Sequence, residues 1–122
     1  ASLVAWKPAG FVRIAGITEQ DISTTKGSVA DWGIFGYGLI GGDACVISGF
    51  RLGKGIDAAG RARRLAWTVT HELGHTFGLE HCPVQGCLME DAAGKAATLD
   101  RSSGSFCARC KSFLVRQGIA TR

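Results

Sequence analysis

Residues 71–82 read His-Glu-Leu-Gly-His-Thr-Phe-Gly-Leu-Glu-His-Cys and contain the pattern H-E-x-x-H-x-x-G-x-x-H. On an α-helix, positions 71 and 75 differ by about 400° of rotation, so both imidazoles leave the same face one turn apart. This geometry suits two corners of a zinc tetrahedron. Glu72 lies about 100° round the helix, beside the metal and not on it. A lone H-E-x-x-H also occurs by chance in helices, so the residues that follow decide between the two interpretations.

Gly78 and His81 complete the pattern. Gly78 lets the chain leave the helix through a left-handed conformation, which a side chain would resist. The turn then brings His81 back as a third nitrogen ligand, and all three histidines of the chain lie in this motif. Three protein ligands leave the fourth zinc position open for water, which separates a catalytic zinc site from a structural one. Glu72 is then placed to take a proton from that water.

The composition is that of one ordinary globular domain. A chain of 122 residues predicts a single domain, 1–122, and contents of 46% hydrophobic and 20% charged residues fit that class. No apolar run approaches the length of a membrane span, and no signal peptide is recognisable. We therefore expect a cytoplasmic monomer with no membrane partner.

The net charge of +4 is weak support for an anionic partner. Arg61, Arg63 and Arg64 lie before the motif, with Lys54 nearby. We interpret them as the solvated first turn of a helix, because no aromatic interleaving or nucleic-acid motif accompanies them. Nucleic acid is therefore not an expected partner, and a protease acting on nucleic-acid-bound proteins is a minor alternative.

Four of the five cysteines form two close pairs joined by a longer connection: Cys82, Cys87, Cys107 and Cys110. This spacing matches a Cys₄ structural zinc site, which supplies on the order of 10 kcal/mol of folding free energy. The alternative is two disulfides, which would imply an oxidising compartment and leave one thiol over. A redox C-x-x-C is disfavoured because no βαβ pattern surrounds it. For Cys45 we favour a buried core thiol over a thiol that reaches the catalytic zinc.

The remaining chain predicts an α+β fold with a small twisted mixed sheet packed on the motif helix. The expected elements are a coil or short strand at 1–10, a strand at 11–17, a loop at 18–31, a bulged strand at 32–40, a turn at 41–43, a strand at 44–52 antiparallel to its neighbour, the helix at 59–79, a loop-rich segment to residue 100 and a helix at 106–117. The edge of the 44–52 strand is expected to hold an extended peptide.

The motif helix has two apolar faces. Leu65, Val69, Leu73 and Phe77 form an i, i+4 stripe, the usual signature of a face directed at the core. The histidines lie roughly opposite this stripe. The helix therefore needs cover on both sides, by the sheet on one and by the rest of the chain on the other.

The full string from residue 71 to residue 110 is H-E-x-x-H-x-x-G-x-x-H-C-x₄-C-x-M-x₁₇-C-x-x-C, with Met89 as its methionine. It resembles the signature of archaemetzincin, a metzincin family of metallopeptidases, at every fixed position. Upstream the likeness is weaker and covers Phe35-Gly36, Val46-Ile47-Ser48 and Arg51-Leu52.

This resemblance implies a zincin-like (metzincin) fold with a loop-rich lower part and a C-terminal helix braced by zinc. It implies a peptidase that hydrolyses peptides or proteins with zinc-bound water and Glu72 as general base, of restricted specificity or aminopeptidase type. The implied ligands of two Zn²⁺ ions per chain are His71, His75 and His81 for the catalytic ion and Cys82, Cys87, Cys107 and Cys110 for the structural ion. Met89 would form a tight turn beneath the catalytic zinc, although a single methionine without that family context would more often be plain core.

Two departures limit what the resemblance carries over. Residues 90–94 read Glu-Asp-Ala-Ala-Gly where many relatives have a polar Asn/Ser-rich stretch beside the primed specificity pocket. The amino-terminal region is also too short for the opening strand and helix of the family. Either the chain is a truncated form, or its sheet is reduced to about three strands. The alternative function is a non-catalytic zinc-binding or peptide-binding module on the same scaffold.

Overall fold

The computed structural model describes residues 13–119, so the expectation for residues 1–10 and the start of the predicted 11–17 strand lie outside the described residues. The elements, in chain order, are β1 (Ile14–Thr18), β2 (Ile22–Lys26), β3 (Val29–Ile34), β4 (Gly36–Gly38), β5 (Ala44–Ser48), α2 (Ala58–Thr76), α3 (Ala96–Asp100) and α4 (Ala108–Arg116). Among these residues, no helix combines the length and the apolar character that crossing a membrane requires.

The main sheet has the strand order β1-β5-β4. β1 pairs with β5 in parallel, and β4 pairs with β5 antiparallel, which confirms the small mixed sheet. The prediction of a peptide-binding edge on the 44–52 strand is wrong. That strand ends at Ser48, as β5, and is hydrogen-bonded to β1 on one side and to β4 on the other. In the described sheet β5 therefore has no free edge, whereas β4 has one.

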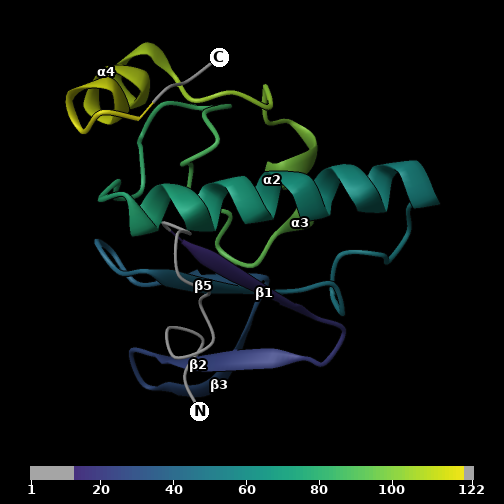
Figure 1. The fold of residues 1–122 in the computed structure, drawn as a ribbon. Helices are drawn as coiled ribbons and strands as arrows, with labels where there is room; N and C mark the ends of the chain where they lie inside the picture. Colours follow the sequence, from purple (N-terminus) through teal and green to yellow (C-terminus); the bar gives the residue numbers. More distant parts are fainter. Residues whose placement is uncertain (1–12, 120–122) are drawn as a thin grey trace.

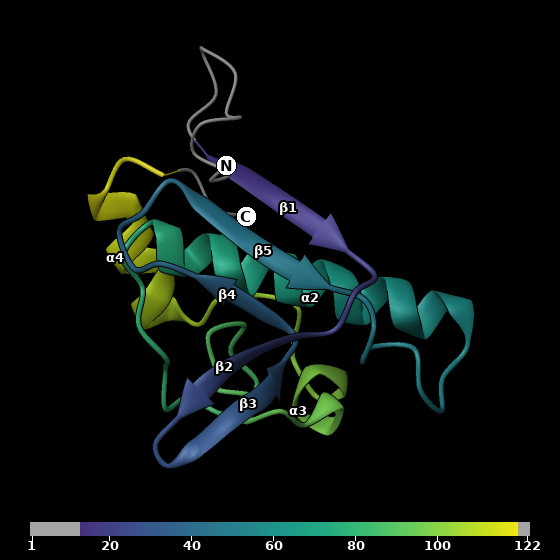
Figure 2. The same cartoon turned by 90° about the horizontal axis from the view of Figure 1, so that it is seen from below.

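Residues 18–31 do not form the predicted loop. β2 and β3 form an antiparallel hairpin in which Lys26 pairs with Val29 across Gly27, whose φ is +60°. Most of their side chains are exposed, so neither strand shows the alternation of apolar and polar residues that identifies a half-buried strand. Figure 2 shows this hairpin beyond the free edge of β4, beside α3.

The prediction of one strand at 32–40 is also wrong. The strand is interrupted at Phe35, which separates β3 from β4, and these two strands belong to different sheets. Phe35 is 9% exposed and forms a core cluster with Leu52 and Leu99, and its carbonyl accepts a hydrogen bond of 2.8 Å from the Ser48 N–H. Burial of one aromatic ring therefore ends the strand.

Helix α2 is the predicted motif helix. Asp57 caps its amino end, since the carboxylate accepts a 2.8 Å hydrogen bond from the Gly60 N–H. The helix ends at Thr76, three residues earlier than the expected position 79. Gly78 then adopts a φ of +106°, which confirms the left-handed exit.

The apolar stripe of α2 is less buried than predicted. Its four residues, Leu65, Val69, Leu73 and Phe77, are all half-buried. The fully buried positions are mostly small or polar: Gly60, Arg64, Thr68, Glu72, Gly74, His75 and Thr76. A helix that lies between two layers and holds a polar site cannot direct one apolar face at one core. The stripe therefore contacts the core only in part: Phe77 packs against the cluster that contains Leu79, and Leu65 packs against the cluster that contains Phe35.

Two layers cover α2, as predicted. The sheet lies on one side, and on the other lie α4 and the segment that leads to it (Figure 1). That second layer holds a core cluster of Leu79, Cys82, Cys87, Met89, Cys110 and Leu114. The predicted C-terminal helix is present as α4, and the short helix α3 lies in the segment predicted to be loop-rich.

Candidate active site

Helix α2 and the turn after it bring the three histidines together. His71 and His75 lie on the last turns of α2, and His81 follows the Gly78 turn. One ring nitrogen from each lies within 4.8 Å of the others, and the Nε2 atoms of His71 and His75 are 3.1 Å apart. A zinc tetrahedron with bonds of about 2.1 Å separates its ligand nitrogens by about 3.4 Å. The cluster therefore fits zinc.

Backbone carbonyls fix the orientation of two of these rings. Nδ1 of His71 donates to the Leu88 carbonyl at 2.6 Å, and Nδ1 of His75 donates to the Leu79 carbonyl at 2.7 Å. A carbonyl only accepts, so the proton of each ring is on Nδ1 and the lone pair of Nε2 faces the centre. Burial lowers the pKa of His71 to about 4 and also lowers the pKa of His75, so both rings are neutral, as metal ligands must be.

His81 is the most accessible of the three histidines. Half of its side chain is exposed, and its Nδ1 lies 3.7 Å from Oδ2 of Asp91. A carboxylate that faces the second ring nitrogen of a zinc-binding histidine is a common orienting partner. Asp91 belongs to the 90–94 segment that departs from the family, and the motif alone did not identify it.

Glu72 lies beside the histidine cluster. Its Oε1 is 3.9 Å from Nε2 of His71, and the residue is 7% exposed. Burial raises the pKa of Glu72 to about 7, although a backbone hydrogen bond from Gly38 acts in the opposite direction. A carboxyl group with a pKa near neutrality is suited to accept a proton and release it again.

Two glycines of β4 permit this position of Glu72. A Cβ on Gly36 would lie 2.8 Å from Cγ of Glu72, and a Cβ on Gly38 would lie 2.6 Å from the Glu72 carbonyl oxygen. The sequence predicts these residues to be part of a bulged strand at 32–40. Alternate glycines within a strand also signal a close approach by another backbone, and that signal was available.

The four predicted thiols also converge. Their sulfur atoms lie within 4.8 Å of one another, at 3.7 Å between Cys82 and Cys107 and 3.8 Å between Cys87 and Cys110. Zinc–thiolate bonds of about 2.3 Å place tetrahedral sulfurs about 3.8 Å apart, whereas a disulfide requires about 2.05 Å. The arrangement fits a closed zinc site and not two disulfides.

Met89 connects the two clusters. It is fully buried, and a Cβ on Gly74, between the two helical histidines, would lie 2.5 Å from the Met89 sulfur. The Met89 carbonyl accepts a 2.8 Å hydrogen bond from the Cys82 N–H. Met89 thus packs beneath the last turns of α2, where a supporting methionine turn was expected.

Hollows open on both sides of Glu72 and His81. One, of about 390 Å³, is lined by residues that include Trp32, Thr68 and Leu99. The other, of about 730 Å³, follows β4 and includes Tyr37 and Ile40. A chain of several residues has room to pass the histidine cluster from one hollow to the other.

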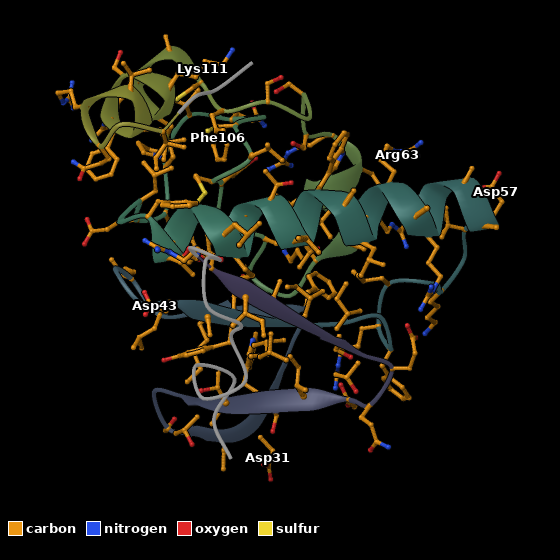
Figure 3. The ribbon with its side chains drawn as sticks, in the orientation of Figure 1. Asp31, Asp43, Asp57, Arg63, Phe106 and Lys111 are labelled. Carbon is orange, nitrogen blue, oxygen red and sulfur yellow. The ribbon has the colours of Figure 1, made fainter. Side chains whose placement is uncertain are left out.

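Four residues considered in the sequence analysis lie apart from this cleft. Arg61 pairs with Glu19, and Arg64 is buried with bonds of 2.8 Å from both Nε and Nη2 to Asp100, so these two are structural. Arg63 is exposed at the opposite end of α2 from the histidines, as Figure 3 shows. Cys45 is 3% exposed on β5, and burial, with a smaller effect of the Glu72 charge, raises its pKa to about 11. It belongs to neither metal-binding cluster.

The fold and the site share the features of the metzincin class of zinc metallopeptidases: a twisted mixed sheet, a helix with two inward histidines and an adjacent glutamate, and a third histidine after a glycine turn. The family model of Peptidase family M54 matches residues 11–116. The chain therefore belongs to peptidase family M54, the archaemetzincin family, and the predicted family and fold are confirmed.

Known archaemetzincins are similar to this chain in sequence and in structure. The archaemetzincin of Methanopyrus kandleri is 36% identical over 106 residues, which cover 87% of this chain and 57% of that protein. Its crystal structure superposes with a TM-score of 0.78 at 33% identity, covering 91% of this chain and 58% of that one. The crystal structure of a zinc-dependent peptidase from Methanocorpusculum labreanum gives 0.71 at 31% identity, covering 84% and 53%. The chain thus spans little more than half the length of these relatives.

Proposed function

We propose that this domain hydrolyses peptide bonds in a zinc-dependent reaction, with His71, His75 and His81 as the zinc ligands and Glu72 as the general base. The observation that carries the proposal is the convergence of the three imidazoles beside Glu72, between two open hollows. Zinc held there supplies a Lewis acid that polarises the scissile carbonyl and lowers the pKa of a coordinated water.

Glu72 moves the proton. Its carboxylate lies 3.9 Å from a proposed ligand nitrogen, close enough to take a proton from the attacking water and pass it to the leaving amine. The Gly38 backbone holds the carboxylate in that position. Asp91 faces His81 and is proposed to orient it.

The substrate is proposed to lie along β4. Within the described residues, β4 is an edge strand. Tyr37 of β4 and Ile40, which follows the strand, line the larger hollow. An extended peptide adds to such an edge through main-chain hydrogen bonds. Because the hollows lie on both sides of Glu72, the geometry favours cleavage within a chain over removal of its first residue.

The four thiols are proposed to hold a second, structural zinc. Cys82 follows His81 directly, and Cys107 and Cys110 lie at the start of α4, where the helix dipole favours thiolates. Such a site would join the turn that carries His81 to α4, and this link supports the proposal that residues 1–122 form a single domain. The hydrogen bond from the Cys82 N–H to the Met89 carbonyl links the proposed structural zinc site to the methionine that packs beneath the histidine cluster.

The test is digestion of a peptide library by zinc-loaded protein, with new termini identified by mass spectrometry. We expect internal cuts that disappear when the zinc is chelated and return when it is restored. Glu72→Gln should keep both zinc ions and reduce the rate by at least about 10²-fold. Intact peptides with a fully zinc-loaded wild type would instead support a binding module, and turnover unchanged in Glu72→Gln would remove Glu72 from the mechanism.

A further inference from the structure

A third hollow, of about 350 Å³, extends the cleft beyond β4. It lies between Ile40, the turn after α2 and helix α4, and it shares Ile40, Glu80 and His81 with the hollow along β4. The two hollows are therefore adjacent. Figure 2 shows β4 running from the β2–β3 hairpin toward α4, so the third hollow lies at the α4 end of the proposed substrate path.

Helix α4 gives this hollow a positive charge. Residues 108–116 contain two arginines, one lysine and no acidic residue. Arg109 and Arg116 both line the hollow, and Phe113 lies between them on the same helix face. In the part of the chain that the structure describes, neither arginine forms an ion pair. Glu80, on the opposite rim, offsets one of the two charges.

The direction of the bound peptide follows from β4. A peptide on this edge pairs antiparallel by preference, since antiparallel pairing is more stable per residue. Its amino-terminal side then lies near Ile40 and its carboxyl-terminal side near Gly36. Glu72 contacts Gly36 and Gly38, so the cleaved bond lies beside them. At about 3.3 Å per residue, the third hollow receives a side chain about three or four positions before that bond.

We propose that Arg109 and Arg116 form a subsite for an acidic side chain, Asp or Glu, on the amino-terminal side of the cleaved bond. This inference rests on the proposed function and narrows its substrates to peptides with an acidic residue upstream of the cut. A guanidinium group matches a carboxylate with two parallel N–H···O bonds, and two unpaired guanidinium groups in one hollow favour an anion. Phe113 forms the apolar wall against which the methylene groups of Glu pack.

A binding experiment tests this subsite without turnover. The probes are two fluorescein-labelled decapeptides of alanine, with Glu-Glu or Gln-Gln near the amino end, titrated into zinc-loaded Glu72→Gln by anisotropy. We expect the Glu peptide to bind about 3- to 10-fold more tightly at low salt, and the difference to vanish near 1 M salt. Adding Arg109→Gln and Arg116→Gln should abolish the preference.

Lys111→Gln is the matched control. Lys111 is on the same helix, about 200° round from Arg109. The substitution therefore removes one positive charge that does not line the hollow. Figure 3 shows Lys111 on the side of α4 that faces away from α2. The control should keep the preference. Equal affinity for the two peptides, or the same loss in Lys111→Gln as in the single Arg109→Gln, would overturn the proposal.

The library digest locates the subsite along the peptide. We expect Asp and Glu to be enriched three or four positions before the cuts of the wild type, and this enrichment to disappear in the double arginine variant while other cuts continue. Cuts without any acidic preference refute the subsite and leave the peptidase proposal intact. If nothing is cut, the peptidase proposal fails, and the anisotropy experiment still decides the subsite.

Discussion

Gly38 and Glu72 are in direct contact across the interface between sheet and helix. A Cβ on Gly38 would lie 2.6 Å from the Glu72 carbonyl oxygen and 3.1 Å from its Oε2. Real Cβ atoms essentially never approach that closely, and the nearer atom is backbone, so it cannot turn aside. The glycine therefore sets how near α2 lies to β4 and where the proposed general base is held.

Gly38→Ala should displace α2 from β4 and move Glu72 relative to the bound peptide. We expect kcat/KM for peptide cleavage to fall about 10- to 100-fold, because small displacements of catalytic groups are costly. Overpacking should also lower the free energy of unfolding by about 1–3 kcal/mol. Both effects are measurable by cleavage kinetics and urea unfolding.

Gly55→Ala is the control for this change. Gly55 has a φ of +71° and open space around its Cα, so alanine there adds backbone strain without a clash. It should cost about 1 kcal/mol and leave kcat/KM unchanged. Wild-type kinetics in Gly38→Ala would show that the contact does not serve the reaction.

Position 89 should tolerate another apolar side chain of similar volume but not a much smaller one. It is fully buried against Gly74 and is not a proposed ligand. Met89→Ala should destabilise the protein by about 2–4 kcal/mol, whereas Met89→Leu should cost less than about 1.5 kcal/mol and keep both zinc ions. Loss of the catalytic zinc in Met89→Leu, seen by metal analysis, would mean that the sulfur itself matters.

Removal of one thiol should break the proposed brace. Cys110 is 4% exposed and belongs to the cysteine cluster. Cys110→Ser should lose the structural zinc and lower the melting temperature of the zinc-loaded protein nearly to that of chelator-treated wild type. Cys45→Ala, which removes the thiol outside the cluster, should retain a large zinc-dependent increase in melting temperature. Equal responses of the two variants would contradict a four-cysteine site.

The Arg64–Asp100 pair should produce an acid-sensitive component of stability. A hydrogen bond from the Arg64 side chain holds the pKa of Asp100 below its usual value, although burial opposes this. A carboxyl group with a folded-state pKa below its unfolded value stabilises the fold above about pH 4, and that stabilisation is lost as the pH falls through the folded-state pKa.

Asp100→Asn should therefore lower the free energy of unfolding at pH 7. The loss should be only about 1 kcal/mol, because solvent reaches the carboxylate and screens the pair. In acid, the free energies of unfolding of the variant and the wild type should become equal. Zinc release at low pH affects both proteins alike, so the difference between their urea midpoints isolates Asp100. Asp21→Asn, in an exposed pair with Arg51, should show a smaller change. A constant difference across the pH range would exclude titration of Asp100 as its source.

Sequence alone predicted the site better than the sheet. His71 and His75 are one helical turn apart and His81 follows six residues later, so short-range geometry brings these ligand atoms together. The two cysteine pairs are 20 or more residues apart in sequence, and their spacing predicted a convergence that the tertiary fold produces. The predicted start of the helix at 59 is within one residue of its start at Ala58, whereas its predicted end at 79 is three residues beyond Thr76.

The strand arrangement depends on contacts that local patterns do not encode. One face of the β2–β3 hairpin is half-buried and the other is exposed, but the residues in these strands carry no alternation of apolar and polar types, so residues 18–31 resembled a loop. The pairing of β1 with β5 joins residues 30 positions apart, such as Ile14 and Ala44, and no local signal records it. The central position of β5, and hence the choice of β4 as the substrate edge, follows only from that pairing.

Native mass spectrometry of the zinc-saturated protein tests the central claim most directly. The account predicts two zinc ions bound to the wild type. In His75→Ala, with the cysteine site intact, it predicts one. A single zinc in the wild type, or two in His75→Ala, would contradict a catalytic zinc held by the three converging imidazoles.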